Sequence, residues 1–119
     1  MEHTLLTAIP IVLTAFFLFA SMVKIFAWPK AIFDKQLIFF INYGLNRALM
    51  AAVGLVEMFG AVALWLPGPL KLLGALAILC TSAGAIFFHL RFDTWKDAIP
   101  AFITLSLSAY LVSVLGTAS

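Results

Sequence analysis

The chain has 119 residues, of which 65% are hydrophobic and 10% are charged, and its mean hydropathy is +1.16. A soluble domain is about half apolar with roughly a quarter of its residues charged, so this composition excludes an ordinary soluble domain and indicates an integral membrane protein. The net charge of +2 is too small and too dispersed for a nucleic-acid-binding protein.

Four long apolar segments account for nearly the whole chain. A helix needs about 20 apolar residues to cross the hydrocarbon core of a bilayer, and the charged residues divide the sequence into segments of about that length. These segments are Leu5–Phe26, Arg47–Leu66, Lys71–Leu90 and Ala98–Gly116. We therefore expect an all-α protein with a single transmembrane domain over residues 1–119, folded as an antiparallel four-helix bundle.

Residues 27–46, between the first two segments, are too polar at their start for lipid and too apolar for a free loop. Phe33, Leu37, Phe40 and Ile41 recur at helical spacing. This pattern predicts a short amphipathic helix that lies in the headgroup region. An extension of the second span into the interface is the alternative.

The connections between the spans predict an orientation. The stretch "LPGPLK", residues 66–71, favours a tight reversal, because two prolines flanking a glycine cannot continue a helix. With four spans, both termini lie on the side of this turn, and the two charged connections, which carry most of the lysines and arginines, lie on the other. The positive-inside tendency places those connections in the cytoplasm and both termini outside it.

Glu57 is the one charged residue between Arg47 and Lys71, in the stretch "GLVEMFG". It lies ten residues after Arg47 and ten before Pro67, which places it near the bilayer midplane. Because a charge at that depth costs about 2.5–3.5 kcal/mol on insertion scales, we expect Glu57 to face the bundle interior. Gly54 and Ala61 share its face and would let a neighbouring helix approach closely.

Lys24 and His89 end the first and third spans on the same side of the membrane. The Lys24 side chain could extend to the headgroups or turn inward to pair with Glu57. Ala77, Thr81, Ala85 and His89 recur every four residues. This stripe is typical of a helix-contact face that His89 caps at the interface; alternatively, His89 is a donor, acceptor or proton carrier that opens onto the interior.

The remaining polar residues point to no known catalytic chemistry. Thr104, Ser108 and Tyr110 in the fourth span, together with Thr81, are expected to make interhelical hydrogen bonds. No H-E-x-x-H, C-x-x-C, Walker or G-x-G-x-x-G motif is present, and one cysteine with two separated histidines makes a poor metal-ligand set. We therefore expect no metal site and no intrinsic cofactor, and we do not expect the chain to act as an enzyme by itself.

Four stretches carry a family resemblance over nearly the whole chain. They are "FFLFASMVKIF", "RALMAAVGLVEMFGAVALWLPG", "GAIFFH" and "DAIPAF", in that order. The chain resembles the DoxX-like membrane proteins, and it is similar to the related animal chaperone of nicotinic acetylcholine receptors. The resemblance implies a four-helix bundle in a bacterial inner membrane, and it draws attention to Lys24, Glu57 and His89 as a ligand-binding or buried polar cluster.

The resemblance leaves two functions open. Members of the family have been linked to quinol oxidase or thiosulfate–quinone oxidoreductase complexes, which implies an accessory subunit of a membrane redox system with a lipophilic pocket for a quinone-like molecule. Relatives in membrane-protein assembly imply instead an assembly factor, chaperone or structural subunit with no ligand chemistry. In either case we expect the bilayer and a membrane protein, or a second copy of the chain, as partners.

Overall fold

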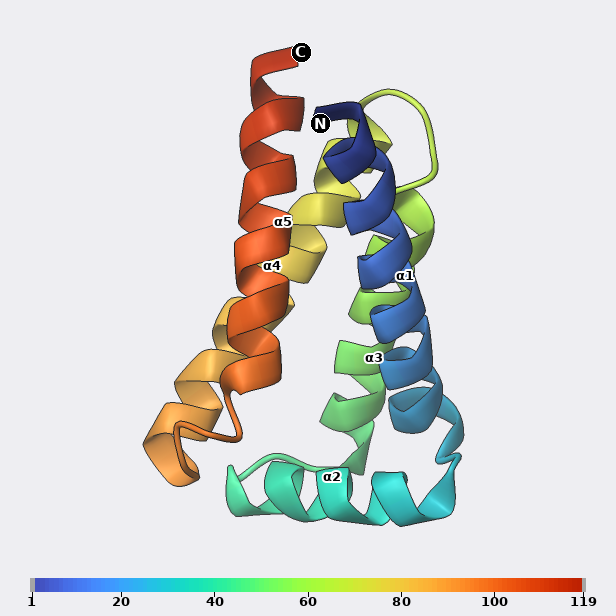
Figure 1. The fold of residues 1–119 in the computed structure, drawn as a ribbon. Helices are drawn as coiled ribbons and strands as arrows, with labels where there is room; N and C mark the ends of the chain where they lie inside the picture. Colours follow the sequence, from blue (N-terminus) through green and yellow to red (C-terminus); the bar gives the residue numbers. More distant parts are fainter. Residues whose placement is uncertain (1, 119) are drawn as a thin grey trace.

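The chain folds into helices connected by short turns. The computed structural model describes residues 2–118, and these form five α-helices and no strand (Figure 1). The helices are α1 Glu2–Phe26, α2 Lys30–Asn42, α3 Arg47–Ala63, α4 Pro69–Phe92 and α5 Ile99–Ala118. The all-α fold class is confirmed, and the helix termini lie close to those predicted for the spans.

Three of these helices, α1, α4 and α5, are long and apolar enough to cross a membrane. The predicted second span is shorter, because α3 ends at Ala63 rather than at Leu66 and has 17 residues. At about 1.5 Å per residue it lies at the lower limit for a transmembrane helix. Together, α2 and α3 have the length and hydropathy of a span, but they are bent by 113° at their junction. The described residues therefore contain three candidate spans, or four if the bent pair counts as one.

The segment between the first two spans contains the expected separate helix. α2 lies across one end of the other helices, and both termini and the α3–α4 turn lie at the opposite end (Figure 1). Phe33 is buried, and Leu37 and Phe40 pack beside it against Val23 and Met50. Ile41 was expected on the same face, but its side chain is 57% exposed. The apolar face of α2 is therefore narrower than the sequence pattern indicated.

Local signals in the sequence determine where α3 and α4 begin. The Asn46 side chain accepts a hydrogen bond from the backbone N–H of Leu49 at 2.9 Å, which caps the start of α3. Gly68 precedes α4 with a φ of +70°, a conformation that glycine adopts without strain, and Pro69 occupies the first turn of that helix. The predicted reversal at "LPGPLK" is thus a helix end followed by a helix start.

Arg47 joins the start of α3 to the end of α1. Its guanidinium donates hydrogen bonds to the backbone oxygens of Lys24 at 2.6 Å and Ile25 at 2.9 Å. These carbonyls lie in the last turn of α1, where helical partners are absent and the helix dipole favours a cation. Arg47 thereby fixes the position of Lys24 relative to α3.

Glycines allow α3 and α4 to cross in backbone contact. A Cβ atom on Gly74 would lie 2.8 Å from both the Cβ of Ala63 and the backbone oxygen of Gly60. A Cβ atom on Gly60 would lie 2.8 Å from Ile78. No side chain fits between the helices at this crossing, which fixes the distance between α3 and α4.

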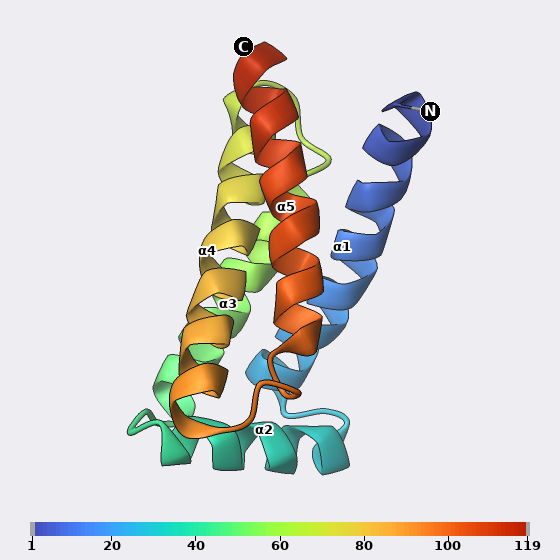
Figure 2. The same cartoon turned by 60° about the vertical axis from the view of Figure 1, so that its left-hand side comes forward.

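The larger of the two hydrophobic clusters lies in the half of the bundle near the termini, and the smaller one, formed by Val23, Phe33 and Met50, lies at the α2 end. The buried residues of the larger cluster come from α1, α3, α4 and α5: Ile9, Leu13, Phe17, Ala20, Ala61, Leu64, Ala75, Ile78 and Leu111. In the half nearest α2, α1 and α3 lie on one side and α4 and α5 on the other (Figure 1), and Figure 2 shows α4 and α5 running side by side toward α2. The cavity described below occupies this second half.

Candidate functional site

A cavity of about 580 Å³ lies in the half of the bundle nearest α2, and every helix contributes to its wall. Ligand pockets usually have volumes of about 300–1,000 Å³, so the cavity is large enough for a drug-sized or cofactor-sized molecule. The aromatic residues of the wall are Phe16, Phe17, Phe39, Phe40, Tyr43 and Phe88. The polar residues of the wall are Lys24, Gln36, Glu57, Thr81, Ser82, His89, Asp97 and Thr104.

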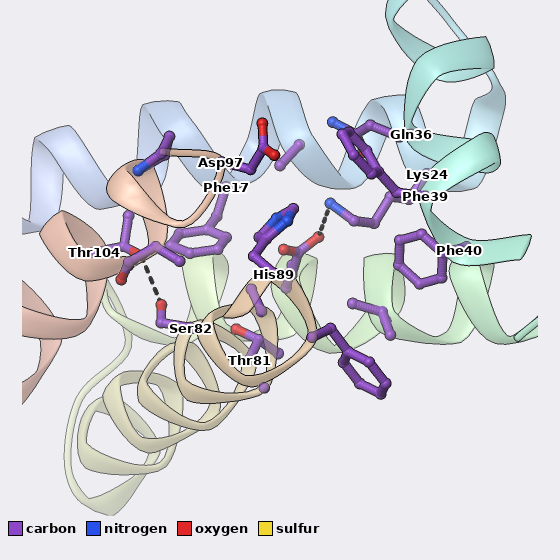
Figure 3. Close-up of a pocket in the computed structure, with 18 of the residues that line it drawn as sticks. Phe17, Lys24, Gln36, Phe39, Phe40, Thr81, Ser82, His89, Asp97 and Thr104 are labelled. Atoms are coloured by element: carbon purple, nitrogen blue, oxygen red, sulfur yellow. Dashed lines mark hydrogen bonds and ion pairs between the residues drawn. The ribbon is translucent and has the colours of Figure 1, made fainter. Parts of the chain in front are cut away.

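Lys24 and Glu57 form an ion pair in the wall of this cavity (Figure 3). The Lys24 Nζ atom lies 3.0 Å from Glu57 Oε1, and the two side chains are only 10% and 7% exposed. Of the two positions considered for Lys24, its side chain therefore takes the inward one. Each charge compensates the other in surroundings where either alone would be costly.

Gly54 allows the helices that carry this pair to approach each other. A Cβ atom at Gly54 would lie 2.8 Å from the Cβ of Lys24 and 3.3 Å from the backbone oxygen of Ser21. α1 and α3 can therefore make close contact one turn from Glu57, as the small residue on its face suggested.

His89 lines the same cavity, but it is bonded to a different set of residues. Its Nδ1 atom lies 2.9 Å from Asp93 Oδ2 and 3.1 Å from the Tyr43 hydroxyl, and that hydroxyl donates to Asp93 Oδ2 at 2.5 Å. The ring also packs edge-on against Phe39. These contacts join the end of α4 to the end of α2 and hold the imidazole at the cavity wall.

The carboxylate of Asp93 determines the roles of the His89 nitrogens. A carboxylate can only accept hydrogen bonds, so the Nδ1 atom beside it carries a proton. In neutral His89 the Nε2 atom is then the acceptor. His89 thus lies in the last turn of α4 and also lines the cavity.

Tyr43 remains a hydroxyl donor because of where it lies. Burial, followed by the hydrogen bond to Asp93 and the charges of Asp93 and Asp97, raises the pKa of Tyr43 well above its ordinary value. Its ring stacks on Phe88 with the centroids 5.0 Å apart. Tyr43 therefore joins the polar cluster to the aromatic wall.

The smaller polar residues are divided between the cavity and the helix contacts. Thr104 lines the cavity and pairs with Ser82 at 2.7 Å, and Thr81 lines it while donating to the backbone oxygen of Ile78. Ser108 is buried and donates to backbone oxygens of its own helix. Tyr110 packs against the hydrophobic core. The sequence grouped these residues together, whereas the structure brings only Thr81 and Thr104 to the cavity.

Asp97 marks the end of the cavity near the α4–α5 connection. Its side chain is exposed, and the backbone N–H and hydroxyl of Thr94 hold the pKa of this carboxyl below its usual value. It remains a carboxylate at neutral pH. The cavity thus runs from apolar walls in the bundle to a charged group near the α2 end (Figure 3).

The sequence pattern of the whole bundle matches a known family. The profile of the DoxX-like family matches residues 8–112, which is most of the chain and includes all the residues of the cavity wall. The chain belongs to the DoxX-like family. No curated protein and no solved structure shows a significant match to it.

Several residues of the site were not predicted. Gln36 lies on α2 and Ser82 on α4, and both line the cavity. Asp93 directly follows α4, and Asp97 lies in the connection between α4 and α5. None of these four residues was singled out from the sequence as a site residue. Asp93 carried a readable signal, because it lies four residues after His89, a spacing at which helical side chains meet. The position of Gln36 on the cavity wall depends on how α2 folds across the bundle, which local patterns do not reveal.

Proposed function

We propose that this DoxX-like protein is an accessory subunit of a membrane redox system and that its cavity holds a quinone-class molecule. The head group would lie beside Lys24, Glu57 and His89. The apolar tail would follow the aromatic walls toward the lipid. The observation that carries the proposal is a 580 Å³ cavity with aromatic walls and a buried ion pair in its wall.

The location of the ion pair supports a binding role over a purely structural one. If two charges served only to fix the register of α1 and α3, they would be enclosed by packed side chains. Here both lie at the boundary of an open space, close to the glycine contact that positions the helices. A few convergent polar groups in an otherwise apolar pocket are typical of sites that bind and orient a lipophilic ligand.

The chain's own residues support binding and orientation rather than electron transfer. No group of three or more His, Cys, Asp or Glu side chains that could hold a metal comes together within residues 2–118. In this proposal, electrons reach or leave the quinone through a partner protein. The chain would supply a site in which the quinone is held and exchanged.

The test is the composition of lipid that remains bound to gently purified protein. We expect about one quinone per chain by mass spectrometry of the extracted lipids. The double variant Lys24→Met/Glu57→Met should lose the quinone while keeping the helices together, because apolar residues of similar size can replace an ion pair. The matched control is Ser106→Ala, on the exposed face of α5, which should retain it.

Two results would contradict the proposal. One is extraction of bulk phospholipid alone from a correctly folded protein. The other is equal quinone content in the wild type and in the double variant. Recovery of one specific membrane protein together with such a ligand-free chain would favour the assembly-factor function instead.

A further inference from the structure

α3 and α4 touch at one end of the bundle and separate toward the other. At their crossing, a Cβ atom on Gly60 would lie 2.8 Å from Ile78 and 3.1 Å from the backbone oxygen of Gly74. Figure 1 shows the two helices farther apart near α2 than at this crossing. The residues on the facing sides of α3 and α4 show what this separation does to the wall of the cavity.

On α3, the face that meets α4 at the crossing is uncovered further along the helix. Val53 and Val56 lie seven and four residues before Gly60, so they share its face. Val56 is 44% exposed, and Val53 is half-buried and lines the cavity. A face covered by a neighbouring helix would be buried, so α4 has already separated from α3 at this level.

On α4, the side chains beside this separation are small. Gly84 lines the cavity, and a Cβ atom placed on it would meet no neighbouring atom of the described chain within 4 Å. Cys80, one turn earlier, is exposed on the outside of the bundle and also lines the cavity. A residue that belongs to both surfaces lies at an opening. The cavity thus opens sideways between α3 and α4, past Val53, Cys80 and Gly84.

This opening lies at the depth of the hydrocarbon core of the bilayer. Cys80 is eleven residues after the start of α4 at Pro69 and twelve before its end at Phe92, which is about 16–18 Å from each end at 1.5 Å per residue. Because the hydrocarbon core is about 30 Å thick, this level is close to its middle, where the ends of the lipid acyl chains lie. The surroundings of the opening are therefore hydrocarbon, not water or head groups.

We infer that the opening framed by Val53, Cys80 and Gly84 is a portal through which the end of one acyl chain of a bilayer phospholipid enters the cavity. An apolar wall without neighbouring atoms forfeits its van der Waals contacts, and apolar cavities bind apolar molecules. A chain end at the bilayer midplane can supply these contacts without burying a polar atom. The inference goes beyond the proposed function, because it concerns what the bilayer supplies to the cavity and holds whether or not a quinone-class head group binds there.

The test is photolabelling in phosphatidylcholine nanodiscs that contain a small fraction of a phosphatidylcholine with a diazirine at the end of one acyl chain. Irradiation produces a carbene that inserts into the bonds it touches, and mass spectrometry of the peptides locates the label. We expect inner labels on Phe17 and Ala20, which are buried and line the cavity. We also expect an outer label on Phe87, which is 60% exposed.

Two substitutions narrow the portal from opposite sides. Gly84→Phe places a ring in the opening, and Val53→Phe enlarges the side chain that borders it on α3. Each variant should lose the inner labels and keep the outer one, and circular dichroism checks that its helices are intact. The matched control is Ala83→Phe, which adds the same ring to the exposed residue beside Gly84 and should keep the inner labels.

Each outcome decides the inference. Loss of the inner labels in either folded variant, with the control unchanged, supports the portal. A wild type that carries only the outer label overturns it, and so do inner labels that persist in both narrowed variants, since the chain then enters by another route. The quinone content of the same wild-type preparation separates the two proposals. Quinone without inner labels overturns the portal alone, and inner labels without quinone overturn the proposed function alone.

Discussion

Lys24 and Glu57 compensate each other's charge within helices that are otherwise apolar. Removal of one partner leaves an uncompensated buried charge, which costs about 3–5 kcal/mol in comparable pairs. We therefore expect Lys24→Met to lower the free energy of unfolding by an amount of that order, measured by denaturant titration in one detergent.

The double variant provides the control for this ion pair. Lys24→Met/Glu57→Met removes both charges and should be considerably more stable than Lys24→Met, because no lone charge remains buried. If the losses for the two single variants simply add in the double variant, the side chains do not interact, and the 3.0 Å pair does not persist in the membrane protein.

Tyr43 should remain protonated at a pH at which an ordinary tyrosine ionises. Its pKa is raised by burial and by Asp93, whereas in the unfolded chain it should titrate near pH 10. The stabilising contribution of Tyr43 is therefore fully present below about pH 10 and is lost as the pH rises above that value. The chain has two tyrosines, so the tyrosinate absorbance of the wild type minus that of Tyr43→Phe isolates this residue. A difference titration centred near pH 10 would contradict the burial of this hydroxyl.

At the scale of the helices, the α3–α4 crossing depends on an absence of side chains. Gly74→Ala would place a methyl group 2.8 Å from the backbone oxygen of Gly60, so the helices must separate. We expect a loss of about 1–3 kcal/mol in the free energy of unfolding, the usual cost of overpacking.

Gly84→Ala is the matched control on the same helix. No atom lies within 4 Å of a Cβ placed at Gly84. Alanine is favoured over glycine in a helix by about 1 kcal/mol, so this variant should be neutral or slightly more stable. Equal destabilisation by both substitutions would mean that the crossing at Gly60 and Gly74 is not close-packed.

The helices were more predictable from the sequence than the site. Long apolar runs indicated α1, α4 and α5 directly, and the proline–glycine turn marked the start of α4. The 113° bend between α2 and α3 was not predictable, because it depends on tertiary contacts such as those of Arg47 with the end of α1.

For the site, the cost of burying a charge was the informative signal. It identified Glu57 and suggested the inward position of Lys24, since a carboxylate in lipid needs a partner. Gln36 is uncharged and carries no such cost, and its place on the wall follows from the packing of α2. His89 was assigned to the interior as one alternative, but its partners Tyr43 and Asp93 belong to segments that meet only after folding.

For the whole molecule, we propose an orientation in the membrane from the separation of charge. The α2 end carries most of the lysines and arginines, and under the positive-inside tendency that end would lie in the cytoplasm. In a Cys80→Ala background, we expect a cysteine at Lys30 to be labelled from the cytoplasm and a cysteine at Leu66 to be labelled from the other side. The reverse pattern of labelling would contradict this orientation.

The arrangement of the bundle, with the larger hydrophobic cluster in one half and a cavity in the other, is the basis of the proposed quinone site. The most direct test is photolabelling with an azido-substituted short-chain quinone, followed by mapping of the labelled peptides. We expect labels on wall segments near Phe39, Tyr43 and Phe88, with labelling suppressed by excess unmodified quinone and lost in Lys24→Met/Glu57→Met. Labels scattered over lipid-facing residues and insensitive to competitor would contradict a quinone-class site in this cavity.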